Sequence, residues 1–164
     1  MTRDNKDIWI KTGYETFALD GKSGLKIEPL AKKVGISKSS FYHHFVDLDC
    51  FLENLFSHHF QMNSILAEKE RSCKTIHSEL INVLLEHKVD LLFNRQLRIN
   101  RNDTRIKEAL IKSDKLLGNY AVMLWAKEIN LKLTERQLEG IFEIATDDFY
   151  MQINKDNLTY CNRE

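Results

Sequence analysis

The chain of 164 residues is 43% hydrophobic and 29% charged, a balance that excludes a disordered protein and indicates a soluble globular chain of one or two small domains. It has no apolar run near the ~18–20 residues of a membrane span and no signal-like start, so we expect a cytoplasmic protein without a membrane partner. Cys50, Cys73 and Cys161 form no close-spaced pair, which is typical of free thiols in a reducing cytosol.

The formal net charge of zero hides an uneven distribution of charge along the chain. Residues 22–45 hold five lysines and one acid, a net charge of +4, whereas residues 46–70 hold five acids and one lysine, a net charge of −4. A phosphate backbone responds to the local field and not to the total charge. The first of these segments is therefore a candidate nucleic-acid-binding region.

Two helices are predicted in the first 34 residues, one before the basic segment and one within it. Residues 7–19 place apolar side chains at helical spacing, and the pair Asp20-Gly21 ends the pattern. Residues 27–34 form a shorter amphipathic helix with Pro29 in its first turn, where a missing amide hydrogen costs nothing. The second helix is thus short and sharply bounded.

A glycine-initiated turn and a third short helix follow. Gly35 stands where a helix end takes a left-handed residue, and Ser37 is a good N-cap for a helix that runs to about His44. Two short helices joined in this way form a helix-turn-helix, which leads into the DNA major groove with the start of its second helix. The residues expected at that start are small hydroxyls and one cation: Ser37, Lys38, Ser39 and Ser40. Tyr42 and His43 are expected to point at the DNA.

The rest of the chain is also predicted to be helical, and no segment shows strand-like alternation. In chain order the expected elements are a long fourth helix from an Asp47 cap to about 70, a fifth helix over 76–93, a basic connection over 94–102, and a sixth helix from 103 or 104 to about 112. The segment 120–126 is apolar almost all round and predicts a buried helix or an interface. The fold class is therefore all-α.

The last helix is the candidate dimer surface. Thr134 and Gln137 form a capping box that opens it. Its apolar side chains repeat every three or four residues and, with 120–126, can form a four-helix interface between two copies: Leu138, Ile141, Phe142, Ala145 and Phe149. The alternative is that these side chains belong to the core of a single chain.

A small-molecule pocket is the second hypothesis for this body. His87 lies on the inward side of the fifth helix, where it is either a core residue or a polar group in an effector pocket. The apolar walls of such a pocket would come from Tyr120, Met123 and Trp125. A run of arginines is expected at the surface, or as the gateway for an anionic ligand: Arg95, Arg98, Arg101 and Arg105.

The sequence contains no motif that indicates a catalytic site, a metal site or a cofactor site. The pairs His43-His44 and His58-His59 are adjacent, so their side chains point about 100° apart on a helix and do not chelate one ion. His59 lies on the apolar stripe of the fourth helix and is predicted to be a core histidine. No glycine-rich phosphate loop, nucleophile elbow or paired-carboxylate setting occurs.

Short motifs across residues 8–55 occur in a characteristic order: Phe17 to Gly21, Leu30-Ala31, Val34-Gly35-Ile36-Ser37, Ser40-Phe41-Tyr42-x-His44-Phe45, and Phe51-Leu52. In this order they resemble the N-terminal domain of the TetR family of transcriptional regulators. The resemblance implies that bases are contacted by Lys38, Ser39 and His43. It implies phosphate contacts from Lys26, Ser40, Tyr42 and His44. Two positions depart from the family: Leu48 replaces a usual lysine, and Lys26 replaces a usual threonine or serine.

The resemblance also implies the domain organisation and the partners. A helix-turn-helix domain over 1–46 would precede a helical dimerisation and ligand-binding body over 47–164. A homodimer would read a palindromic operator in double-stranded DNA and repress transcription until a small molecule releases it. Two alternatives remain: a TetR-like DNA- or protein-binding factor without an effector, and an all-α enzyme or metal protein.

Overall fold

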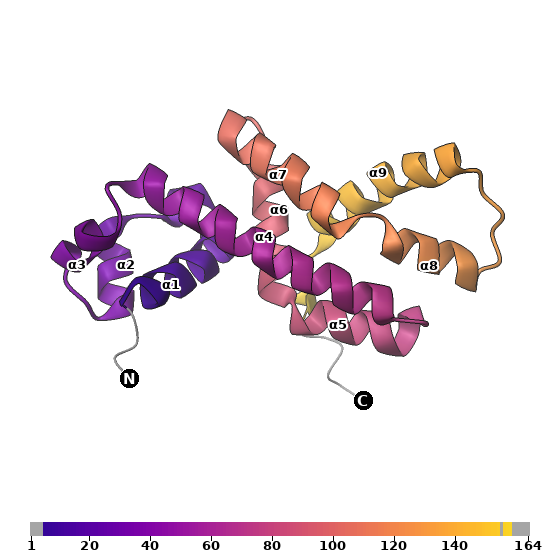
Figure 1. The fold of residues 1–164 in the computed structure, drawn as a ribbon, viewed down its shortest axis with the longest axis horizontal. Coiled ribbons are helices and arrows are strands. Elements are labelled where there is room, and N and C mark those ends of the chain that lie inside the picture. Colours follow the sequence, from indigo (N-terminus) through magenta and orange to yellow (C-terminus); the bar gives the residue numbers. More distant parts are fainter. Residues whose placement is uncertain (1–4, 155, 159–164) are drawn as a thin grey trace.

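The computed structural model describes residues 5–154 and 156–158, and throughout these ranges the secondary structure is helical (Figure 1). The all-α prediction is confirmed. The elements are α1 Asn5–Asp20, η1 Lys22–Gly24, α2 Ile27–Val34, α3 Lys38–His44, α4 Leu48–Ser72, η2 Ile76–Leu80, α5 Ile81–Glu86, α6 Lys88–Ile99, α7 Thr104–Leu117, α8 Tyr120–Glu128 and α9 Glu135–Gln152. Within the same ranges, no helix combines the length and the apolar character that crossing a membrane requires.

The helix-turn-helix forms where the local signals predict it. Gly35 ends α2 in the left-handed conformation, with φ of 73°, and its amide donates to the Ala31 carbonyl. Asp47 caps α4, because its carboxylate accepts a hydrogen bond of 2.7 Å from the Cys50 amide. Ser37 occupies the N-cap position of α3, but its hydroxyl forms no capping hydrogen bond. Sharp stops at both ends of α2 and α3 fix the angle between them.

The body differs from the prediction between residues 76 and 117. The prediction of a single helix over 76–93 is wrong. A π-helical turn, η2, leads into α5, and the helix is interrupted at His87, which has φ of −97° and ψ of 25°. The expected connection over 94–102 is wrong as well, because α6 continues to Ile99. The sixth predicted helix is α7, which runs five residues beyond Lys112 to Leu117.

The side chain of Arg98 lies in the interior of the body, within the polar segment that α6 makes helical. Its side chain is buried, although the sequence favoured a solvated surface for this arginine run. Its guanidinium donates to Asp114 at 2.7 Å and to Asp147 at 3.0 Å, and lies 4.1 Å from the Tyr150 ring centroid. Partners on α7 and α9 thus compensate the cost of burying the charge, and none of them is near Arg98 in sequence.

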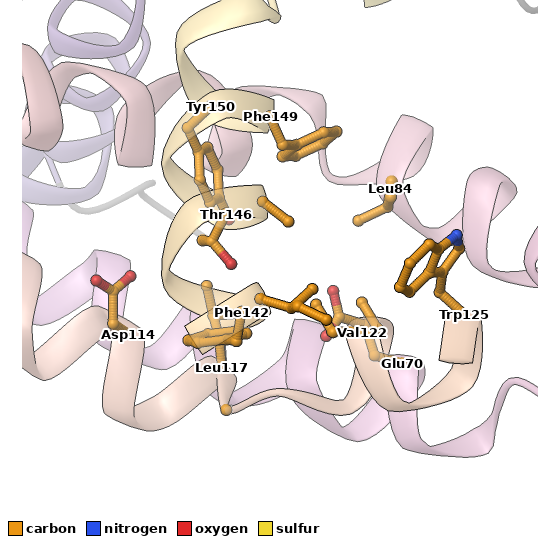
Figure 2. A pocket seen from close by; sticks show the side chains of 14 residues that line it. Glu70, Leu84, Asp114, Leu117, Val122, Trp125, Phe142, Thr146, Phe149 and Tyr150 are labelled. Atoms are coloured by element: carbon orange, nitrogen blue, oxygen red, sulfur yellow. The ribbon is translucent and has the colours of Figure 1, made fainter. Parts of the chain in front are cut away.

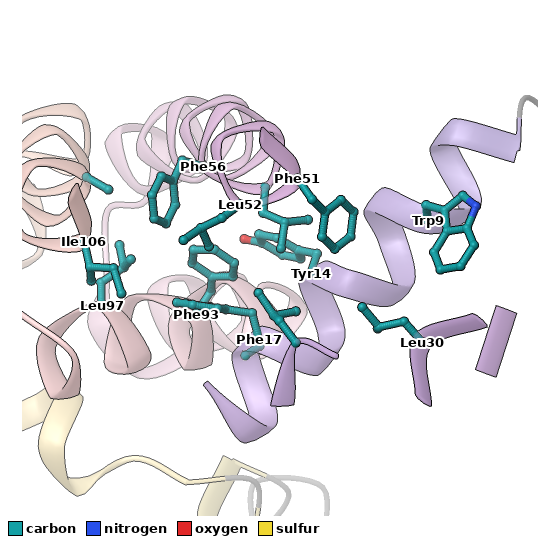
Figure 3. Close-up of a cluster of buried hydrophobic side chains, with 14 of the residues drawn as sticks. Trp9, Tyr14, Phe17, Leu30, Phe51, Leu52, Phe56, Phe93, Leu97 and Ile106 are labelled. Atoms are coloured by element: carbon teal, nitrogen blue, oxygen red, sulfur yellow. The ribbon is translucent and has the colours of Figure 1, made fainter. Parts of the chain in front are cut away.

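The main core joins the helix-turn-helix to the body (Figure 3). Phe93 of α6 packs on Tyr14 and Phe17 of α1, with ring centroids 4.5 Å and 4.4 Å away. Gly13 lets α1 approach α4 closely, since an added Cβ would lie 2.3 Å from a ring carbon of Phe51. One buried cluster includes residues on both sides of position 46, and the domain division at that position stays a prediction.

Phe93→Ala should lower the free energy of unfolding by about 3–5 kcal/mol, because it removes a ring that touches two helices and leaves a cavity. Ile99→Ala on the same helix is the control, since Ile99 is 43% exposed. Equilibrium urea denaturation followed by circular dichroism measures both. Equal losses for the two variants would contradict the role given to Phe93.

Candidate functional site

The first candidate site is the outer face of α3, at one end of the molecule (Figure 1). Phe41 and Phe45 are buried and hold the helix on the core. The predicted base contacts Lys38, Ser39 and His43 are all exposed, and Ser39 and His43 lie on the side of the helix away from these two rings. Of the predicted phosphate contacts, Tyr42 and Lys26 are exposed, and Ser40 and His44 are half-buried. With the exposed Ser37, the residues of α3 form one polar surface, whereas Lys26 lies on another element, at the N-cap of α2.

Two contacts restrain this surface in the free protein. Lys38 forms an ion pair with Glu28 of α2, and this contact lowers the pKa of the Glu28 carboxyl. The Trp9 indole of α1 donates to the Ser40 hydroxyl at 3.4 Å. Both partners of Lys38 and Ser40 lie outside α3, so the position of the surface depends on α1 and α2.

Not every lysine of the basic segment faces this surface. Lys22 pairs with Asp103 at the start of α7, and Lys33 donates to the Thr16 hydroxyl at 3.2 Å. Lys26, at the N-cap of α2, and Lys32, within this helix, are exposed. Leu48 is half-buried and packs against the main core, which gives an apolar residue a packing role at the start of α4.

A buried polar network lies where α1 meets the body. The Tyr14 hydroxyl donates to Asp90 at 2.6 Å, and His87 contacts the other oxygen of the same carboxylate at 2.7 Å. The Tyr14 oxygen also lies 2.7 Å from Nδ1 of His59, and Asn63 donates to Nε2 of that ring at 3.2 Å. These contacts assign the proton of His59 to Nδ1. The network therefore ties α1 to both α4 and α6.

The electrostatics of the network follow from its burial. Desolvation lowers the pKa of His59 to about 3, so its imidazole is neutral at physiological pH. Burial and the neighbouring Asp90 carboxylate raise the pKa of Tyr14. The prediction of a core histidine at position 59 is confirmed by this setting, in which the side chain is fully buried and hydrogen-bonded. In the described part of the chain, no group of three potential ligands is placed to hold a metal ion.

The second candidate site is a pocket in the body, with a volume of about 300 Å³ (Figure 2). Its walls come from the end of α4, from α5, from the end of α7 and from facing sides of α8 and α9. The lining is mostly apolar and includes aromatic rings: Leu84, Leu117, Ala121, Val122, Trp125, Ile141, Phe142, Ala145, Phe149 and Tyr150. Its polar side chains are Glu70, Asp114 and Thr146. Pockets of this size and character receive small organic molecules.

Of the four residues predicted for an effector pocket, Trp125 lines this one. His87 is buried elsewhere, because the break before α6 directs its ring to Asp90. Tyr120 donates its hydroxyl to the Cys73 carbonyl at 2.9 Å, and Met123 is 47% exposed on α8. Glu70 also lines this pocket and is not among the residues that the sequence predicts. One signal was available, since Glu70 continues the inward stripe of α4 four residues after the buried Leu66.

The predicted dimer helix is present as α9, and Thr134 and Gln137 form its capping box. Four of the five predicted interface residues line the pocket within one chain: Ile141, Phe142, Ala145 and Phe149. The fifth, Leu138, is half-buried. The other side of α9 is apolar and exposed at Ile144, which is 76% exposed, and at Met151, which is 51% exposed. The helix over 120–126 is α8, of which Leu124 and Ala126 are buried.

Comparisons with known proteins show the fold. A crystal structure from Shewanella sp. PV-4, assigned to the TetR family of transcription regulators, is 17% identical, covers 90% of this chain and 86% of its own, and superposes with a TM-score of 0.54. A second, from Mesorhizobium loti MAFF303099 and also assigned as a TetR-family transcriptional regulator, is 18% identical, with coverages of 94% and 89% and a TM-score of 0.59. No protein-family model matches the sequence, and no curated protein is similar to it. The expected TetR-like fold is thereby confirmed.

Tyr14→Phe should lower the free energy of unfolding by about 1–3 kcal/mol, because it leaves a buried Asp90 oxygen and Nδ1 of His59 without their partner. Tyr42→Phe makes the same chemical change at an exposed position and should have little effect. Urea denaturation of both variants measures the difference. A neutral effect of Tyr14→Phe would show that the network does not stabilise the fold.

Proposed function

We propose that this chain is a transcriptional regulator of the TetR type that binds double-stranded DNA through α3. The observation that carries the proposal is the exposed polar face of α3, on a fold shared with two proteins assigned to that class of regulator. The start of the second helix of such a unit enters the major groove, and here Lys38 and Ser39 stand at that position without bulky neighbours. Lys38, Ser39 and His43 contact bases in this proposal.

Phosphate contacts complete the proposed interface. Ser40, Tyr42 and His44 border the base-reading residues, and Lys26 stands at the N-cap of α2, on the flank of the unit. Leu48 packs against the core, so the start of α4 offers no cation at this position. In this proposal Lys26 supplies a cation for a phosphate in its place. On DNA, the bases compete with Glu28 for Lys38. The proposal assigns no catalytic role and no metal to any residue.

Specific reading of DNA by one short helix generally needs two copies related by a two-fold axis. Two exposed apolar side chains of α9 support a homodimer, since Ile144 and Met151 are seven residues apart and share one side of the helix. The dimer surface is thus proposed on the α8–α9 arm, with the Leu138–Phe149 stripe behind it. A homodimer of this kind would read a palindromic operator.

The proposed regulation is repression that a small molecule relieves. The start of α4 packs with the helix-turn-helix, and its last turn reaches the pocket at Glu70. This helix of 25 residues spans about 37 Å and connects the two candidate sites directly. A ligand that prefers a position of α4 that DNA disfavours must weaken DNA binding to the same extent that DNA weakens the binding of the ligand.

Lys26→Ala should weaken binding to every DNA sequence alike and reduce the slope of log affinity against log salt by about 0.9, as expected for one lost phosphate contact. Glu28→Gln should have the opposite effect, because it releases Lys38 and removes a negative charge from the interface. Fluorescence anisotropy with genomic DNA fragments at several salt concentrations measures both variants.

The control for these variants is Lys74→Ala, an exposed lysine just after the end of α4, whereas α3 packs at the start of that helix. It should leave affinity and salt slope unchanged. A Lys26→Ala effect confined to one operator base would contradict the assigned phosphate contact. Absence of salt-dependent DNA binding in the unaltered protein would refute the proposed function as a whole.

Ile144→Glu should raise the dissociation constant of the homodimer by about tenfold or more, because a charge at the centre of an apolar interface is buried without a partner. Ile111→Glu on α7 introduces the same charge at a side chain that is 48% exposed and should not change it. Sedimentation velocity over a range of protein concentrations distinguishes the two. A monomer in the unaltered protein would rule out the proposed dimer.

A further inference from the structure

Glu70 is an acid in an apolar setting without a partner. Its residue is 7% exposed, and its carboxyl neither accepts a hydrogen bond from nor forms an ion pair with any of the described residues. It lines the pocket and lies between Phe142 and Trp125 in the view of Figure 2. An ionised carboxylate that is withdrawn from water is costly unless an opposite charge or hydrogen-bond donors compensate it. The pocket wall provides neither.

The remaining wall of the pocket has no positive charge. Asp114 is the other acidic residue of the lining, and Arg98 donates to it at 2.7 Å, so that its charge is compensated. The lining contains no lysine, arginine or histidine. Four aromatic rings complete it. The Tyr150 ring already packs against the Arg98 guanidinium, and the faces of the other three can attract a cation: Trp125, Phe142 and Phe149.

We infer that the pocket binds an organic cation with an apolar body, such as a hydrophobic amine or quaternary ammonium ion, and that Glu70 is the counter-ion for its positive charge. Aliphatic side chains such as Leu84 and Leu117 contact the apolar body. An anion would meet an uncompensated carboxylate, and a neutral ligand would leave it without a partner. Charge complementarity therefore selects the cation. The inference rests on the proposed function, since it names the effector class of the same pocket.

The ionisation of Glu70 couples this site to pH. Burial raises the pKa of its carboxyl to about 7, and the nearby Arg71 opposes that rise. Cys73 on the same segment and Tyr150 on α9 also interact with it, and burial raises the pKa of both, so they stay neutral near pH 7. The lining residues of α5 and α8 carry no charge. A permanent cation should thus bind more tightly as the pH rises and Glu70 ionises.

A matched pair of probes separates charge from shape. Benzyltrimethylammonium carries a charge that does not depend on pH, and neopentylbenzene is its neutral isostere, with carbon in place of nitrogen. Isothermal titration calorimetry on the full chain, at pH 6 and pH 8, gives the affinity for each. The variant is Glu70→Gln, which keeps the shape and removes the charge. Its control is Glu68→Gln, an exposed glutamate on the same helix.

The cation should bind the unaltered protein about tenfold more tightly at pH 8 than at pH 6, as expected when a carboxyl with a pKa near 7 ionises. At pH 8 the affinity for the cation should exceed the affinity for its isostere by about tenfold or more. Glu70→Gln should remove both the pH dependence and this difference between the probes, whereas Glu68→Gln should keep them. Equal affinities for the two probes, cation binding that survives Glu70→Gln, or binding of neither probe at millimolar concentration would each overturn the inference.

DNA binding, measured separately on the same samples, distinguishes this inference from the proposed function. Salt-dependent DNA binding together with failure of the cation to bind would overturn the ligand class and leave the regulator intact. Cation binding that depends on Glu70, in a protein that does not bind DNA, would support the ligand class and refute the regulator. Release of DNA by the cation, but not by its isostere, supports both.

Discussion

The contact of Phe93 with Tyr14 and Phe17 joins α6 to α1, and the position of the helix-turn-helix relative to the body depends on it. The polar network extends this contact, because the Tyr14 hydroxyl reaches Asp90 on α6 and His59 on α4. A ring stack supplies apolar area, whereas buried hydrogen bonds make one arrangement of the three helices preferable to others. The proposed DNA-reading surface is thus oriented in part by side chains of the body, Phe93, Asp90 and His59.

Helix α4 connects the two candidate sites through one continuous backbone. Its first residues pack behind α3, His59 and Asn63 take part in the polar network at its middle, and Glu70 enters the pocket in its last turns. In the proposed regulation, this continuous helix would carry a change at the pocket to the helix-turn-helix as a tilt or a shift of the whole element. The polar network in the middle has discrete hydrogen-bond partners, which favours distinct positions over a continuous range.

The helix-turn-helix could be predicted almost completely because its determinants are local. Pro29 in a first turn, Gly35 at a left-handed helix end and Asp47 as an N-cap act within four residues along the chain, and the structure has helix boundaries at or beside each. The body could be predicted only as helical. Arg98 was expected at the surface because charged residues usually are, and its partners Asp114 and Asp147 become neighbours only when α7 and α9 pack on α6.

The helical class, the bounds of α2 and α3, and the polar face that α3 presents follow from local sequence signals, since apolar spacing and capping act over one or two turns. Tertiary structure alone decided the break at His87, the burial of Arg98 and the pocket around Glu70. A sequence shows that a glutamate continues an apolar stripe but not whether a cation meets it, because that depends on which helices pack against the stripe. For Glu70 the pocket lining brings aromatic and aliphatic groups and no basic side chain.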